Sequence, residues 1–134
     1  MIFLQYLSDV FDYIDDAVML VSKENSRYNL IMANKSFFAI SDYSKSDEGK
    51  YVDELVPEKE YTNLRAQYEN VSENKLPLAF RSKTGEGDSL KYYSSKLIPI
   101  LDSFDKCTHI VVVSKDITEV EKLKAEIQQL KSTI

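Results

Sequence analysis

The sequence predicts an α+β fold in which one antiparallel sheet is flanked by helices. Three observations support this class. Short apolar runs occur in groups on either side of a helical middle segment. Polar or glycine-containing turns join neighbouring runs, as in hairpins. After the last run, residues 115–134 become a charged helical repeat with a narrow apolar stripe. The chain has 134 residues, enough for one domain with a hydrophobic core.

The composition excludes several classes of protein. The formal net charge is −5, and no run of lysine and arginine interleaves with aromatics, so we expect no nucleic-acid partner. Apolar runs such as residues 17–21 and 110–113 are far shorter than the roughly 20 residues of a membrane span. The N-terminus lacks the basic residues of a signal peptide. The single cysteine, Cys107, rules out an intrachain disulfide and suits a reducing compartment, so a cytoplasmic protein is expected.

The first expected element is an amphipathic helix over residues 2–14. Its apolar stripe consists of Phe3, Leu7, Val10 and Ile14. This helix either packs on its own domain or joins a dimer interface.

A hairpin is expected next, with strands over residues 17–22 and 28–33. Asn34 then stands at the N-cap position of a short helix over residues 35–41. Its side-chain oxygen can accept a hydrogen bond from a free amide in the first helical turn.

The middle of the chain is expected to be helical. Residues 51–55 form one helical turn, and Pro57 opens a longer helix from Glu58 to about Asn74. The apolar residues at helical spacing in the longer helix are Tyr61, Leu64, Tyr68 and Val71.

Three more strands are expected over residues 78–83, 90–98 and 107–114. The glycines in the loop after the first of them supply the positive φ angles of a hairpin turn. Pro99 is expected to end the second strand, because proline has no N–H to donate to a ladder.

The C-terminal segment carries the pattern of a parallel two-stranded coiled coil. Thr118 and Glu121 form a capping box, so the helix is expected to begin at Thr118. The alternative is a terminal helix that docks on its own domain, since fewer than three heptads are present. The apolar residues of the expected dimer seam, alternately three and four apart, are Val120, Leu123, Ile127, Leu130 and Ile134.

Five short segments stand out in chain order. They are Asn34-Lys35-Ser36-Phe37, Asp42-Tyr43-Ser44, Gly49 with residues 52–57, Leu97-Ile98-Pro99-Ile100, and Asp116-Ile117-Thr118. In this order they resemble the N-x-A/S-F, G-Y-S, G…dl.P, terminal Pi and D-I-T segments of the PAS domain family, and the resemblance covers nearly the whole chain. An aspartate, Asp42, replaces the glycine of the second motif.

The resemblance implies a five-stranded antiparallel sheet with helices over one face, and a cavity between them where members hold a ligand or cofactor. It divides the chain into an N-terminal flanking helix (1–16), a PAS domain (17–117) and a C-terminal coiled-coil signalling helix (118–134). It implies a sensor or interaction module ahead of an output domain, commonly a histidine kinase of a two-component system or a cyclic-dinucleotide enzyme. The C-terminal seam adds the expectation of a dimer, and the lack of a catalytic set of residues adds the expectation that the domain is not an enzyme. Asn34, Asp116 and Thr118 are then expected to couple the domain to its helices. The rival interpretation is a constitutive dimerisation or docking module that binds no small molecule.

The residues argue against the cofactors best known in this fold. A covalent flavin site needs a cysteine in the helices after Asn34, whereas Cys107 opens the last strand. A haem sensor usually takes its axial histidine from the long helix, but His109 lies on a strand. One histidine and one cysteine do not make a metal cluster or a nucleophile with its base. An unidentified small organic ligand stays open, as does a non-covalently bound flavin or other chromophore.

The candidate cavity residues are aromatic and aliphatic side chains on the expected inward faces. Tyrosine suits a pocket with few polar anchors, because it combines an apolar ring with one hydroxyl. The opposite interpretation is that these rings fill the core and leave no usable void. Arg81 and Lys96 could meet a ligand carboxylate if they pointed inward, although such strand residues more often face water. The candidates are Phe37, Phe38, Tyr51, Tyr61, Leu64, Phe80 and Tyr92.

Overall fold

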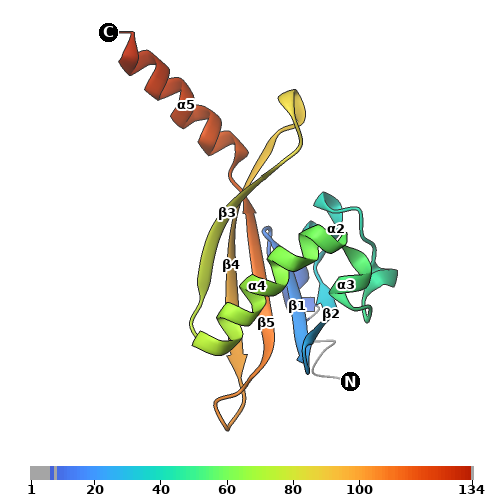
Figure 1. Ribbon diagram of the computed structural model, residues 1–134. Coiled ribbons are helices and arrows are strands. Elements are labelled where there is room, and N and C mark those ends of the chain that lie inside the picture. Colours follow the sequence, from blue (N-terminus) through green and yellow to red (C-terminus); the bar gives the residue numbers. More distant parts are fainter. Residues whose placement is uncertain (1–6, 8, 134) are drawn as a thin grey trace.

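A computed structural model describes residues 7 and 9–133 of the chain. Over these residues five strands form one sheet in the order β2-β1-β5-β4-β3, and all neighbouring strands are antiparallel (Figure 1). The strands are β1 (Ala17–Glu24), β2 (Arg27–Ala33), β3 (Leu78–Thr84), β4 (Lys91–Leu101) and β5 (Cys107–Asp116).

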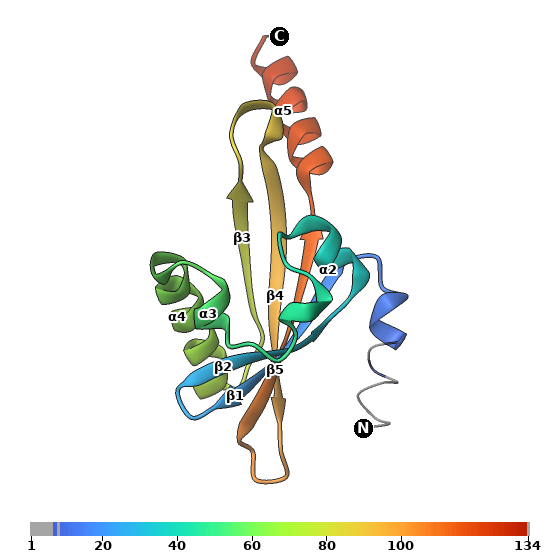
Figure 2. The ribbon, with the colours of Figure 1, turned by 90° about the vertical axis from the view of Figure 1, so that its right-hand side faces the viewer.

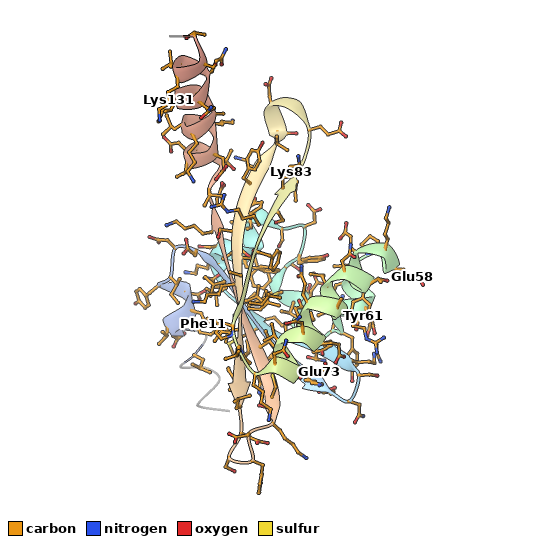
Figure 3. All side chains as sticks on the ribbon, turned by 60° about the vertical axis from the view of Figure 1, so that its left-hand side comes forward. Phe11, Glu58, Tyr61, Glu73, Lys83 and Lys131 are labelled. Atoms are coloured by element: carbon orange, nitrogen blue, oxygen red, sulfur yellow. The ribbon has the colours of Figure 1, made fainter. Side chains whose placement is uncertain are left out.

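The helices lie on both sides of this sheet. Figure 2 shows α3 and α4 on one side and the helical residues 9–12 on the other. Figure 3 shows the same separation, with Phe11 on one side of the sheet and Glu58, Tyr61 and Glu73 of α4 on the other. The arrangement confirms the predicted fold class. The helices are α2 (Lys35–Ile40), α3 (Val52–Leu55), α4 (Glu58–Asn74) and α5 (Thr118–Ser132), with short 3-10 turns η1 (Lys45–Asp47) and η2 (Gly87–Ser89).

The predicted end of the fourth strand is wrong. Pro99 does not end β4, which continues to Leu101 and pairs Pro99 with Ile110 of β5. Strand β3 reaches only as far as the pair Leu78 and Leu97. Beyond Leu97, β4 therefore has a strand neighbour on one side only, and a proline is tolerated there because its other side needs no ladder hydrogen bond.

The core lies between the sheet and α4. The inward face of the sheet contributes Val21, Leu97 and Ile110, each at most 1% exposed. The helix contributes Tyr68 and Val71, which were expected to face inward from their helical spacing. Alternate strand residues share one face, so this register also fixes which side chains point away from the core.

The N-terminal helix ends two residues earlier than expected. Its described part ends at Asp12, and the chain then turns through Tyr13 and Ile14 into β1. Val10 of the predicted stripe is 57% exposed, whereas Leu7 and Phe11 are half-buried, so the more buried side of the helix includes Leu7 and Phe11 but not Val10. The part of the prediction that concerns residues 1–6 lies outside the described residues.

Helix α5 begins at Thr118, as predicted, and projects away from the end of the sheet (Figure 1). The predicted capping box is wrong: Ile117 holds the N-cap position and makes no side-chain capping bond. The physical reason lies in β4, whose contacts with Thr118 are described below.

Candidate functional site: two clasps at one end of the sheet

Asn34 joins β1 to α2 through its side-chain oxygen. Oδ1 accepts hydrogen bonds from the amides of Val18 and Phe37, both at 3.0 Å. The second of these is the N-cap bond predicted from the sequence. The first satisfies an amide of β1, and the backbone N–H of Asn34 in turn donates to the carbonyl of Val18 at 2.9 Å.

The same side chain holds the segment that leads into the sheet. Nδ2 lies within hydrogen-bond distance of the carbonyl oxygens of Phe11 (3.0 Å), Ile14 (3.1 Å) and Asp16 (2.8 Å). An amide has two N–H groups, so the three carbonyls share two donors. Asn34 is 0% exposed, so these protein groups take the place of water as partners of its side-chain amide. We call this cluster the Asn34 clasp.

A carboxylate reinforces the Asn34 clasp at the start of α2. Oδ1 of Asp12 accepts a hydrogen bond from the backbone amide of Lys35 at 3.0 Å. A negative charge beside the free amides of a helix start is stabilising, because those amides carry the positive end of the helix dipole. The end of the N-terminal helix therefore bonds both to Asn34 and to the helix that Asn34 caps.

A second cluster fixes the point where α5 leaves the sheet. The amide of Ile117 donates to the carbonyl of Tyr92 at 2.9 Å, and the amide of Tyr92 donates to Oγ1 of Thr118 at 2.9 Å. The amide of Thr118 donates to Oδ1 of Asp116 at 2.9 Å. We call these residues the Thr118 clasp. Thr118 is 7% exposed, so its hydroxyl serves a buried strand amide and is not free to cap its own helix.

The Thr118 clasp keeps Asp116 ionised. Hydrogen bonds from the Thr118 hydroxyl, and next from its amide, hold the pKa of the Asp116 carboxyl below its usual value. The positive charges of Lys91 and Lys122 act in the same direction. The sequence placed Asp116 and Thr118 together, and the structure adds Tyr92, whose role in this cluster was not foreseen.

The two clasps lie at the same end of the sheet. Ala17 at the start of β1 pairs with Ser114 near the end of β5. Asn34 bonds to the residues on either side of Ala17, and Asp116 follows Ser114 by two positions. The chain therefore enters and leaves its sheet on adjacent strands.

A groove of about 200 Å³ lies between α2 and the inward face of the sheet at this end. Its apolar wall includes Phe37 and Ile40 of α2, and its floor includes Tyr93, Ser95 and Ser114. The two serine hydroxyls are 2.8 Å apart, and only one of them donates to the other. The remaining hydroxyl proton is available to an acceptor. We call this the serine groove.

The space between α4 and the sheet is filled by tyrosine rings. Tyr28 and Tyr68 are at most 1% exposed, and their ring centroids are 4.9 Å apart. Burial raises the pKa of both phenols. The hydroxyl of Tyr68 has no hydrogen-bond partner among the described residues. No local pattern indicates that Tyr28 is the partner of Tyr68, because the two rings come from elements forty residues apart.

The predicted cavity residues fall into several places. Tyr61, Leu64 and Phe80 pack against the core cluster. Phe37 and Phe38 lie on α2 with ring centroids 5.6 Å apart, and Phe37 lines the serine groove.

Two further candidates lie away from these. Tyr51 sits at the surface, with the Arg27 guanidinium 3.6 Å above its ring and its hydroxyl donating to Glu24 at 2.7 Å. Tyr92 points to the opposite face of β4 from Leu97, toward Ile117. The structure therefore does not bring Tyr51 and Tyr92 together with the other five residues.

The predicted seam residues are open to solvent along α5. Val120, Leu123, Ile127 and Leu130 are 48–65% exposed in the single chain. The described part of α5 touches the sheet through its first turn, where Glu121 forms an ion pair with Arg81 at 3.2 Å. Sequence reasoning missed this pair, because it depends on the register of β3. Ile134 lies outside the described residues.

Among the described residues, no group of three or more His, Cys, Asp or Glu side chains is placed to hold a metal ion. No described helix combines the length and the apolar character that crossing a membrane requires.

Comparison with known proteins agrees with this fold. The PAS domain of BvgS from Bordetella pertussis superposes with a TM-score of 0.72 at 15% identity, covering 100% of both chains. A PAS domain from Colwellia psychrerythraea gives a TM-score of 0.65 at 20% identity, covering 87% of this chain and 98% of that one. A sensory box sensor histidine kinase from Vibrio cholerae gives 0.61 at 18% identity, covering 86% of this chain and 92% of that one.

The sequence comparison is specific for the family. No curated protein matches the chain. The family model described as a PAS domain matches residues 15–119, which span β1 to the first turn of α5. The chain therefore belongs to the PAS domain family.

Proposed function

We propose that this PAS domain is a sensory relay that dimerises through α5 and passes a conformational change to a C-terminal output domain. In this proposal residues 1–16 are a flanking helix, 17–117 the sensing body and 118–134 the signalling helix. The output domain is a histidine kinase or a cyclic-dinucleotide enzyme, and the domain itself catalyses nothing.

The single observation that carries the proposal is the way α5 leaves the sheet. Its first turn is fixed by the Thr118 clasp, while its described seam residues are 48–65% exposed and are covered by none of the described elements of the same chain. Apolar residues that are alternately three and four positions apart are buried when a second helix with the same spacing packs against them. A change in β4 or β5 would then move the start of both helices, and an output domain could respond to their rotation or shift.

The serine groove is the proposed point of entry for a ligand signal. It touches α2, which the Asn34 clasp holds, and β5, which leads to the Thr118 clasp. A molecule in this groove would contact elements attached to both the Asn34 clasp and the Thr118 clasp.

The proposal is tested by sedimentation velocity of the wild type and of a Leu123→Glu/Ile127→Glu variant. We expect a wild-type dimer and a monomeric variant, because two carboxylates would be buried in the seam. The matched control is Leu76→Glu/Phe104→Glu, which changes two exposed apolar residues outside α5 and should stay dimeric. A monomeric wild type at high concentration would contradict the proposal.

Coupling is tested separately by fusing the chain in register to a histidine kinase core. Asp116→Ala removes the acceptor of the Thr118 amide and should uncouple kinase activity from the state of the domain, while the variant stays folded. Unchanged signalling in the Asp116→Ala fusion would argue against the coupling role.

The second candidate is a constitutive dimerisation or docking module with no small-molecule ligand. The observation that favours it is the filling of the space under α4 by Tyr28 and Tyr68. Native mass spectrometry of the purified protein distinguishes the two candidates. A co-purified small molecule supports the sensor, and a ligand-free dimer supports the module.

A further inference from the structure

The outer face of the sheet, opposite to the core, carries a group of cations. Arg81 on β3 pairs with Ser94 on β4, which pairs in turn with Lys115 on β5, so the three share one face. Lys83 and Lys96 each lie two residues along their strands from a member of this row, and therefore point the same way. Arg81, Lys83, Lys96 and Lys115 are all exposed. We call these four residues the basic face.

The basic face stands out because the whole chain has a net charge of −5. A carboxylate that does meet it comes from α5: Oε1 of Glu121 lies 3.2 Å from Nη1 of Arg81. The Arg81 side chain is still 66% exposed in this pair. An exposed ion pair of this kind contributes little to stability, so another carboxylate can replace Glu121 at little cost.

A groove separates the basic face from the start of α5. Its volume is about 310 Å³, and Arg81, Lys83, Tyr92, Ile117 and Glu121 contribute to its walls. Figure 3 shows Lys83 on the part of β3 that rises toward α5. The groove therefore offers an arginine, a lysine and a tyrosine ring next to the Thr118 clasp.

We propose that the basic face docks an acidic segment of a partner protein, whose carboxylates replace Glu121 at Arg81. Charge complementarity supports this docking. Arginine offers a planar fork of donors that matches a carboxylate, and the lysines around it add positive charge along an extended segment. The exchange removes a contact that ties the first turn of α5 to β3, so docking would loosen the helix that the proposed function makes the output.

A simpler interpretation is that these cations only protect an edge strand. Strand β3 lies at the end of the sheet order, and charged side chains on edge strands discourage pairing with other chains. That interpretation gives Glu121 no role in binding an acidic molecule, whereas the proposal makes Glu121 a competitor. The two therefore predict different results for a Glu121 variant.

The first experiment measures fluorescence anisotropy of a labelled oligoglutamate peptide at low salt. We expect binding by the wild type and about tenfold weaker binding by Lys83→Glu/Lys96→Glu. The matched control is Lys45→Glu/Lys59→Glu, which changes two exposed lysines of η1 and α4 by the same charge and should bind like the wild type. No binding by the wild type, or equal losses in both variants, would overturn the proposal.

The second experiment removes the competitor. Glu121→Gln should strengthen peptide binding about threefold, because Arg81 is released. Glu126→Gln makes the same charge change on the same helix, but Glu126 lines a different groove with Lys91 and Lys122, so its effect should be absent. Equal effects of the two variants would show that peptide binding responds only to the overall charge. That result would overturn the proposal that a partner's carboxylate replaces Glu121 at Arg81.

A second copy of the chain is the main alternative occupant, and sedimentation velocity identifies it. The proposal expects Lys83→Glu/Lys96→Glu to keep the oligomeric state of the wild type. If that variant instead dissociates a dimer, the basic face belongs to an interface between copies, and the acidic-partner proposal fails. The proposed dimer through α5 is judged by the seam variants and not by this result.

Discussion

Replacing Asn34 tests the Asn34 clasp most sharply. Asn34→Ala removes the acceptor of two amides and the donor of three carbonyl oxygens in a site that is 0% exposed. Loss of the N-cap bond alone costs about 1 kcal/mol. A buried strand amide without a partner, here that of Val18, costs about 1–3 kcal/mol more. We therefore expect a loss of about 2–4 kcal/mol, a large part of the 5–15 kcal/mol that typically stabilises a domain.

Asn34→Asp tests the acceptor role of the Asn34 side chain separately from its donor role. The new carboxyl can still accept from the amides of Val18 and Phe37, but its second oxygen faces three carbonyl oxygens where an N–H₂ group stood. These surroundings raise the pKa of the carboxyl in the folded state above its unfolded value. The destabilisation caused by Asn34→Asp therefore has its full size above the folded-state pKa of the new carboxyl. As the pH drops from there toward the unfolded-state pKa near 4, the destabilisation falls by up to about 1.4 kcal/mol per pH unit.

The assay is urea unfolding followed by circular dichroism at pH 7 and pH 5. The free energy of unfolding is derived with one value of m, its slope against urea concentration, for all variants. The matched control is Asn63→Asp, an exposed position on α4, which should change stability by less than about 0.5 kcal/mol. The reasoning is refuted if Asn34→Ala costs less than about 1 kcal/mol. It is also refuted if Asn34→Asp behaves like Asn63→Asp at both pH values.

Three further predictions concern the tyrosine core and the Thr118 clasp. Tyr68→Phe removes a buried hydroxyl that has no partner among the described residues, so urea unfolding should show a gain of about 1 kcal/mol, and a loss of that size would contradict the packing described. Thr118→Val removes the acceptor of the Tyr92 amide, so hydrogen exchange at Tyr92 should accelerate, while Thr118→Ser should keep the wild-type rate. The pKa of Asp116 is lowered in the folded state, so its stabilising effect is present near neutral pH and is lost as the pH falls below about 4. Unfolding titrations from pH 7 to pH 3 should therefore show a smaller acid-induced loss for Asp116→Asn than for the wild type, and identical profiles would count against the clasp.

Much of the fold could be predicted because local patterns and tertiary structure agree. The spacing of Tyr61, Leu64, Tyr68 and Val71 predicted α4, whose bounds match the expected residues 58–74. The position of Asn34 predicted its N-cap bond to Phe37. The three carbonyls that its amide group meets precede it by 18–23 residues, and nothing local in the sequence indicates them.

The site was harder to predict where local and distant partners compete. Thr118 followed by Glu121 has the pattern of a capping box, yet the Thr118 hydroxyl serves Tyr92 and the Glu121 carboxylate meets Arg81. Both outcomes depend on the register of β4 and β3. Register also decides that Tyr92 points away from the face that holds Phe80.

The central claim is that the sheet controls a paired α5 through the Thr118 clasp. Its most direct test is double electron–electron resonance between copies labelled at Gln128→Cys in a Cys107→Ser background. The account predicts one narrow distance distribution for this protein, and a shifted or broadened one when Thr118→Val is added. The account is contradicted if no distance between copies is detected, or if Thr118→Val leaves the distribution unchanged.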